Sequence, residues 1–158
     1  MVYVDGFFAG IIGAAIVAVL FLFIDTVTSL PLYTPTVLGT GLFMGAEDLA
    51  APEQGQLSYR LTLMYTGVHG LVFIVLGVLG AQFVLLTKNR LNLGSSTLLL
   101  FLILELGFVG TWYFVAAQVL NQLTWTVVLL GNLLAATGMA IYLRLRNPRA
   151  SAGRLRPR

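Results

Sequence analysis

Long apolar stretches separated by short polar segments dominate the chain. The clearest one runs from Leu61 to Thr87, contains no residue charged at pH 7, and has a single histidine, His69, near its middle. A helix of roughly 20 residues crosses a hydrocarbon layer of ~30 Å, so this stretch is long enough to span a membrane. The pattern predicts a transmembrane helix over residues 59–87.

The uncharged stretch at residues 6–24 predicts an earlier span, over residues 5–27. It is followed by a long connection in which prolines favour an extended backbone. Thr34 and Pro35 then form a good helix start, with threonine as the cap and proline at the first helical position. We expect a short apolar helix over residues 35–45, which is too short to cross and lies in the interface or against the bundle.

A short basic connection follows the span at residues 59–87. From there to the arginine-rich C-terminal part, Glu105 is the only charged residue. This apolar region is too long for one span and suits two spans joined by a tight turn. We expect helices over residues 97–120 and 124–144. Either Ser95 or Ser96 can cap the first of these two helices.

Together these segments predict an all-α membrane protein with four transmembrane helices in an antiparallel bundle and a short interfacial helix between the first two. The bundle forms one domain, residues 1–144, and an Arg-rich tail follows at residues 145–158. The composition is 58% hydrophobic and 9% charged, whereas soluble domains have about 25% charged residues. The chain has no cysteine, which excludes disulfides, zinc thiolate sites and iron–sulfur clusters within it.

Charge is distributed unevenly between the two predicted sides of the membrane. Four spans place both termini and the middle connection on one side, which contains every basic residue except Arg60. Because positive charge near helix ends stays cytoplasmic, we expect a multi-pass protein of the bacterial inner membrane with both termini cytoplasmic. Asp25, at the other side, is expected to reach water at the interface. The arginines expected to bind anionic lipid headgroups or a partner are Arg144, Arg146, Arg149, Arg154, Arg156 and Arg158.

Small residues recur every four positions along the first predicted helix. In a bilayer such a face allows two helix backbones to approach closely, so we expect an internal crossing with the helix at 59–87. Bulky phenylalanines on the opposite side would face lipid or another subunit. The small residues are Gly6, Gly10, Ala14 and Ala18, with Gly70, Gly77 and Ala81 in the facing helix, and the phenylalanines are Phe7, Phe8, Phe21 and Phe23.

His69 and Glu105 are the ionisable groups predicted at membrane depth, offset by roughly 7 Å along the membrane normal. Such groups are costly in lipid, so each of them is a candidate functional residue. The simplest role for His69 is a hydrogen bond to Tyr65, Glu105 or Asn132. The alternatives are ligation of a haem or chlorin and a proton or ion relay. Glu105 is expected to be protonated and to donate to a carbonyl, and Asn132 to join two helices.

The sequence offers no catalytic group set. It has one histidine and lacks clustered carboxylates, a phosphate-binding loop and metal-ligand spacing, so we do not expect an enzyme. We expect a non-catalytic accessory or structural subunit of a multi-subunit bacterial inner-membrane complex, of which an energy-transducing complex, respiratory or photosynthetic, is one candidate. The alternatives are a small transporter or proton-conducting protein using His69 and Glu105, and a haem- or pigment-binding subunit with His69 as ligand. Expected partners are the lipid bilayer and other membrane subunits, without nucleic acid.

Two segments, DTVTSLPLYTPTVLGTGLF and YTGVHGLVFIVLGVLGA, resemble a pattern that recurs in uncharacterised bacterial four-span inner-membrane proteins. In that pattern an acidic residue ends the first helix, Pro-Leu-aromatic-Thr-Pro and Leu-Gly follow, and the second helix contains Tyr-Thr-x-x-His. The resemblance covers residues 6–81 and implies a bacterial inner-membrane location without indicating an activity. The matching residues are Asp25, Pro31, Leu32, Tyr33, Thr34, Pro35, Leu38, Gly39, Tyr65, Thr66 and His69.

Overall fold

The computed structural model describes residues 2–28, 30–44, 57–86, 92–114 and 125–146. These parts of the chain form helices and no strand. The helices are α1 (Val2–Thr28), α2 (Tyr33–Phe43), α3 (Tyr59–Leu86), α4 (Leu93–Phe114) and α6 (Trp125–Arg146). All of them except α2 are long and apolar enough to cross a membrane. The predicted all-α bundle of four spans, with a short helix between the first two, is therefore confirmed.

The helices start within four residues of the predicted positions, and the differences at α4 and α2 have local causes. α4 begins at Leu93 because the side chain of Asn92 accepts a hydrogen bond from the N–H of Ser95 at 2.7 Å and caps the helix in place of a serine. α2 begins at Tyr33, where a side chain of α1 provides the cap, as described below. The predicted end of the third span at residue 120 and the turn after it lie outside the described residues.

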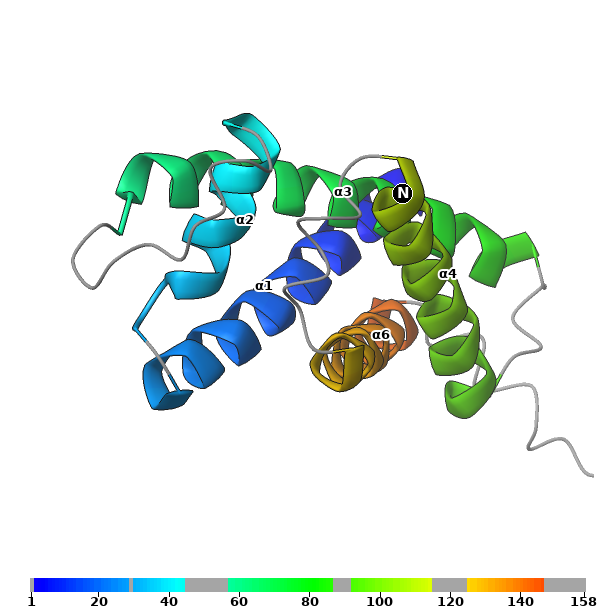
Figure 1. Ribbon diagram of the computed structural model, residues 1–158. Coiled ribbons are helices and arrows are strands. Elements are labelled where there is room, and N and C mark those ends of the chain that lie inside the picture. Colours follow the sequence, from blue (N-terminus) through cyan, green and yellow to red (C-terminus); the bar gives the residue numbers. More distant parts are fainter. Residues whose placement is uncertain (1, 29, 45–56, 87–91, 115–124, 147–158) are drawn as a thin grey trace, which may run out of the picture.

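α1 packs against both α3 and α6 (Figure 1). α6 lies between α1 and α4, and α4 packs against α6 more extensively than against α3. The hydrophobic core combines side chains from all four spans, including Phe73 of α3, Leu100 of α4 and Met139 of α6. The short helix α2 packs on the first half of α3 (Figure 1).

α1 and α3 meet backbone to backbone at glycines. A Cβ atom on Gly6 would lie 2.6 Å from the Cα of Val78, and a Cβ on Gly77 would lie 2.6 Å from the backbone N of Gly10. Neither distance leaves space for a side chain, and the atoms in the way belong to the backbone. The small face of α1 is therefore used inside the bundle, against α3.

The close crossing is shorter than the predicted stripe of small residues. Ala14 and Ala81 are buried, but Ala18 is exposed. Gly70 makes no close contact, since a Cβ there would meet no atom within 4 Å. The two helices diverge toward the end of α1 (Figure 1), and neither Ala18 nor Gly70 belongs to the crossing.

The phenylalanines of α1 divide between two environments. Phe7, Phe8 and Phe23 are exposed on the outside of the bundle, Phe23 to 66%. Phe21 was expected there as well, but it packs against the hydrophobic core. The outer face of α1 is thus aromatic at both ends, while Phe21 belongs to the interior.

The start of α1 and the end of α6 lie at the same end of the bundle. Arg146 Nε is 3.3 Å from Asp5 Oδ1, and the Arg146 side chain is 59% exposed. Such an exposed pair contributes at most about 1 kcal/mol, but it places the two helix ends together, as an even number of spans requires. Arg144 also lies in the last turn of α6. The remaining arginines of the predicted tail, Arg149, Arg154, Arg156 and Arg158, lie outside the described residues.

Candidate functional site

Asp25, near the end of α1, is only 3% exposed, so the expectation that it reaches water was wrong. Its Oδ2 accepts a hydrogen bond from the backbone N–H of Thr34 at 2.8 Å, and its Oδ1 accepts one from the Thr34 hydroxyl at 2.5 Å. Thr34 lies in the first turn of α2, where N–H groups have no partner within the helix and the helix dipole favours a negative charge. α1 therefore supplies the cap of α2.

The backbone before α2 adopts an unusual conformation that accompanies this contact. Leu32 has a φ of 68°, a left-handed conformation that costs a residue with a side chain roughly 1–2 kcal/mol. The N–H of Tyr33 donates to the carbonyl of Leu30 at 3.0 Å and closes the turn. A strained residue of this kind persists where the surrounding contacts determine its position. Here the Asp25–Thr34 hydrogen bonds are those contacts.

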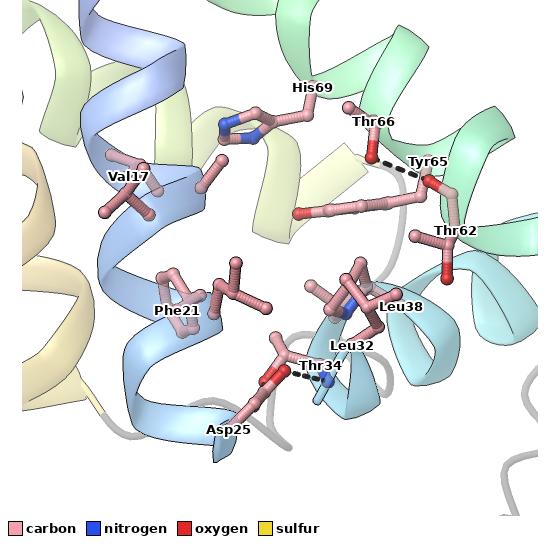
Figure 2. Close-up of a pocket in the computed structure, with 14 residues that line it drawn as sticks. Val17, Phe21, Asp25, Leu32, Thr34, Leu38, Thr62, Tyr65, Thr66 and His69 are labelled. Carbon is pink, nitrogen blue, oxygen red and sulfur yellow. Dashed lines mark hydrogen bonds between the residues drawn. The ribbon is translucent and has the colours of Figure 1, made fainter. Parts of the chain in front are cut away.

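A cavity of about 210 Å³ lies between α1, α2 and α3 (Figure 2). The Asp25–Thr34 pair closes one end, and His69 of α3 lies at the other, with Tyr65 between them. Most of the remaining wall is apolar and comes from α1, α2 and the turn before α2, including Val17, Phe21, Leu32 and Leu38.

Tyr65 projects across this cavity, and its hydroxyl points toward the interior (Figure 2). No hydrogen bond joins this hydroxyl to any other described residue. The neighbouring threonines are already engaged. Thr62 Oγ1 lies 3.1 Å from Thr36 Oγ1 of α2, and Thr66 Oγ1 donates to the carbonyl of Thr62 at 2.7 Å. Among the described residues of the wall, the Tyr65 hydroxyl is therefore the one that is not already hydrogen-bonded to the protein.

His69 contacts the backbone of α1. Its Nε2 lies 3.4 Å from the carbonyl oxygen of Ala14. Because a carbonyl oxygen can only accept, Nε2 carries the proton, and Nδ1 of the neutral ring remains an acceptor. The ring lies between those of Tyr65 and Phe73, with centroid distances of 5.9 Å and 4.7 Å. The hydrogen-bond partner is thus a backbone carbonyl and none of the three expected side chains.

This contact bears on the haem or chlorin alternative. A metal bound to Nε2 of His69 would take the place of the hydrogen bond to Ala14, so ligation there would require the ring to move away from α1. Among the described residues, no group of three or more His, Cys, Asp or Glu side chains is placed to hold a metal ion.

A second cavity, of about 130 Å³, lies between α1, α3, α4 and α6, and its wall also includes His69 and Tyr65. Asn132 of α6 lines it and donates from Nδ2 to Glu105 Oε1 of α4 at 2.9 Å. Glu105 therefore accepts a hydrogen bond from a side chain, whereas we expected it to donate to a carbonyl. Within the described residues no hydrogen bond joins His69 to Glu105. The two are connected only indirectly, because Asn132, which binds Glu105, lines the same second cavity as His69.

The residues of the sequence pattern meet around the first cavity, although they come from three helices. Comparisons with protein families, curated proteins and solved structures found no match to this chain. Gly39, also in the pattern, allows α2 to approach α3, because a Cβ there would lie 2.7 Å from the carbonyl oxygen of Leu61. Spacing along the chain could not show that the acidic residue of the pattern binds its threonine. The pattern residues in the cavity wall are Asp25, Leu32, Thr34, Pro35, Leu38, Tyr65, Thr66 and His69.

Proposed function

We propose that the chain is a non-catalytic accessory subunit of a multi-subunit complex in the bacterial inner membrane. The observation that supports this role best is that buried polar side chains form hydrogen bonds between helices. Among the described residues, every fully enclosed side-chain nitrogen or oxygen has a hydrogen-bond partner, and the Tyr65 hydroxyl, which faces the cavity, is not fully enclosed. Several of the side-chain hydrogen bonds join helices to one another, as Asp25 joins α1 to α2 and Asn132 joins α6 to α4. Polar groups that are costly in lipid thus stabilise the bundle, which favours a structural role over a catalytic one.

The outer face of α1 is the surface that we propose for contact with another subunit. Its small face is buried against α3, so the side turned away from the bundle presents Phe7, Phe8 and Phe23. Large rigid aromatic side chains lose little conformational entropy on binding and dominate many interfaces. We further propose an energy-transducing complex, respiratory or photosynthetic, as the host.

Extraction of the membrane with a lipid-preserving polymer, followed by mass analysis of the co-migrating proteins, tests the subunit role. We expect the chain to migrate in a larger complex. Alanine at both Phe8 and Phe23 should release it from that complex without changing its own resistance to unfolding, because both side chains are exposed in the isolated bundle. Migration of the native chain as a monomer or a homo-oligomer would overturn the proposal.

A small proton-conducting protein is the alternative that one observation favours, since His69 lies in the walls of both cavities. Its two ionisable groups, however, are each engaged elsewhere, His69 with Ala14 and Glu105 with Asn132. A relay would need both hydrogen bonds to break in each cycle. The structural role needs no such rearrangement, and we therefore prefer it.

We also propose that both ends of the chain face the cytoplasm. Arg144 and Arg146 end α6 at the same end of the bundle as Asp5, and positive charge near a helix end is retained on the cytoplasmic side. Reporter fusions after Asn89 and after Arg158 should therefore read cytoplasmic, and a fusion after Gln54 should read external. A cytoplasmic reading after Gln54 would contradict this topology.

A further inference from the structure

We propose that the cavity between α1, α2 and α3 binds a neutral, membrane-soluble molecule with a single hydroxylated ring, such as a substituted phenol or a quinol headgroup. This site goes beyond the proposed subunit role and does not depend on it. The inference rests on four features of the cavity, namely its volume, its hydrogen-bonding groups, its charge and its connection to the lipid.

The volume limits the ligand to about one ring. A dry apolar cavity of about 150 Å³ holds a benzene molecule, and sites for drug-sized ligands start at about 300 Å³. The cavity of about 210 Å³ lies between these values. A six-membered ring with a few small substituents therefore fits, whereas a macrocycle such as a haem or chlorin does not.

The hydrogen-bonding groups select a hydroxyl on that ring. The Tyr65 hydroxyl points into the cavity and has no partner among the described residues, so it can donate. Nε2 of His69 is committed to the Ala14 carbonyl, which leaves Nδ1 as an acceptor. A hydroxyl group both accepts and donates, so it complements this donor and this acceptor. An ether or a ketone, which can only accept, would leave Nδ1 without a donor.

The charge of the wall selects a neutral molecule. No lysine or arginine is among the described residues that line the cavity. The single carboxylate, that of Asp25, already accepts two hydrogen bonds from Thr34. An anionic ligand such as a fatty acid would therefore find no counter-charge, and a cationic one would compete with the cap of α2.

Aromatic side chains and the exposed rim complete the site. Tyr65, His69 and Phe73 follow one another at four-residue spacing, so their rings form a row along one face of α3. Tyr65 and His69 of this row line the cavity, so a ligand ring can pack against them. Val19 and Leu22 line the cavity and are also exposed on the outside of α1, so the cavity opens toward the surrounding lipid. A molecule dissolved in the membrane can enter there without crossing water.

The test uses durenol (tetramethylphenol) and durene, which has the same methylated ring without the hydroxyl. Each is titrated into the purified full-length protein in lipid nanodiscs, with empty nanodiscs subtracted, and binding is followed by equilibrium dialysis. We expect saturable binding of durenol that is about tenfold tighter than that of durene. Tyr65→Phe should weaken durenol binding about fivefold and leave durene unchanged, since one hydrogen bond is lost and the ring is kept.

Two matched controls separate the site from general effects. Tyr59→Phe changes an exposed tyrosine of the same helix that does not line the cavity, and it should leave durenol binding unchanged. Ala18→Phe places a ring in the cavity wall and should abolish binding, whereas Ala15→Phe, at an exposed position of α1 outside that wall, should not.

Three results would overturn the proposal. Equal affinity for durene and durenol would mean that the cavity takes an apolar chain, such as a lipid acyl tail. No saturable binding above the empty nanodiscs would mean that lipid or water fills the cavity. Unchanged durenol affinity in Tyr65→Phe, with the variant as resistant to unfolding as the native protein, would mean that the hydroxyl takes no part in recognition.

Discussion

Alanine at Gly10 is expected to force α1 away from α3 and to lower the free energy of unfolding by about 2–3 kcal/mol. The added Cβ would lie 2.5 Å from the Cα of Ile74 and 2.9 Å from its backbone N, and backbone atoms within a helix cannot move aside as a flexible side chain can. Overpacking of this kind costs about 1–3 kcal/mol and exceeds the gain in helix propensity from glycine to alanine. Unfolding of the purified protein by titration with sodium dodecyl sulfate measures the effect.

Gly70→Ala is the matched control, because Gly70 lies within α3 and a Cβ there would meet no atom within 4 Å. Its unfolding free energy should change by no more than about 0.5 kcal/mol, or rise slightly. Similar losses in Gly10→Ala and Gly70→Ala would contradict the close crossing at Gly10 and Gly77. A stable Gly10→Ala monomer that no longer joins a partner would instead assign the small face of α1 to an external interface.

Leucine at Asp25 is expected to release the start of α2 and to cost about 2–4 kcal/mol. The backbone N–H and the hydroxyl of Thr34 would both lose their acceptor in a buried place, and an unsatisfied buried donor costs about 1–3 kcal/mol. Asp25→Asn keeps one carbonyl oxygen as an acceptor and should lose less. The order of stability should therefore be native, Asp25→Asn, Asp25→Leu, in the same unfolding titration.

The release of α2 can be measured separately, because the chain has no cysteine. Leu38 of α2 is 3% exposed, so a single Leu38→Cys should react slowly with a membrane-permeant maleimide. The rate should rise when Asp25→Leu is added. Asp5→Leu removes the other aspartate of α1, whose partner among the described residues is the exposed Arg146, and should leave the rate unchanged. Equal protection of Leu38→Cys in all three backgrounds would contradict the capping role of Asp25.

The four spans could be predicted from the sequence because length and the absence of charge are sufficient evidence for a membrane helix. Which glycines form the crossing between α1 and α3 was predictable only in part. Gly70 and Gly77 are equally small, and the direction in which α3 leaves α1 decides which of them is in the crossing. That direction depends on the packing of all the helices together, so no local pattern expresses it.

The chemistry of the candidate site was less predictable, and the reason is physical. The partner of His69 is the backbone carbonyl of Ala14, and every residue has such a group, so the sequence does not mark it. The burial of Asp25 depends on the path of the chain through Leu32, whose left-handed conformation is unusual for leucine. Eight residues of the pattern line the first cavity, and the pattern itself does not show why they belong together.

The position of α6 between α1 and α4 has a consequence for biosynthesis. A ribosome delivers the spans in chain order, so α1 and α3 can cross at their glycines as soon as α3 has entered the membrane. α4 then enters before α6, the helix against which it packs most extensively, has been made. A chain arrested before α6 would keep the α1–α3 pair and leave α4 with only its smaller contact with α3. Insertion of the last span is therefore the event that completes the bundle.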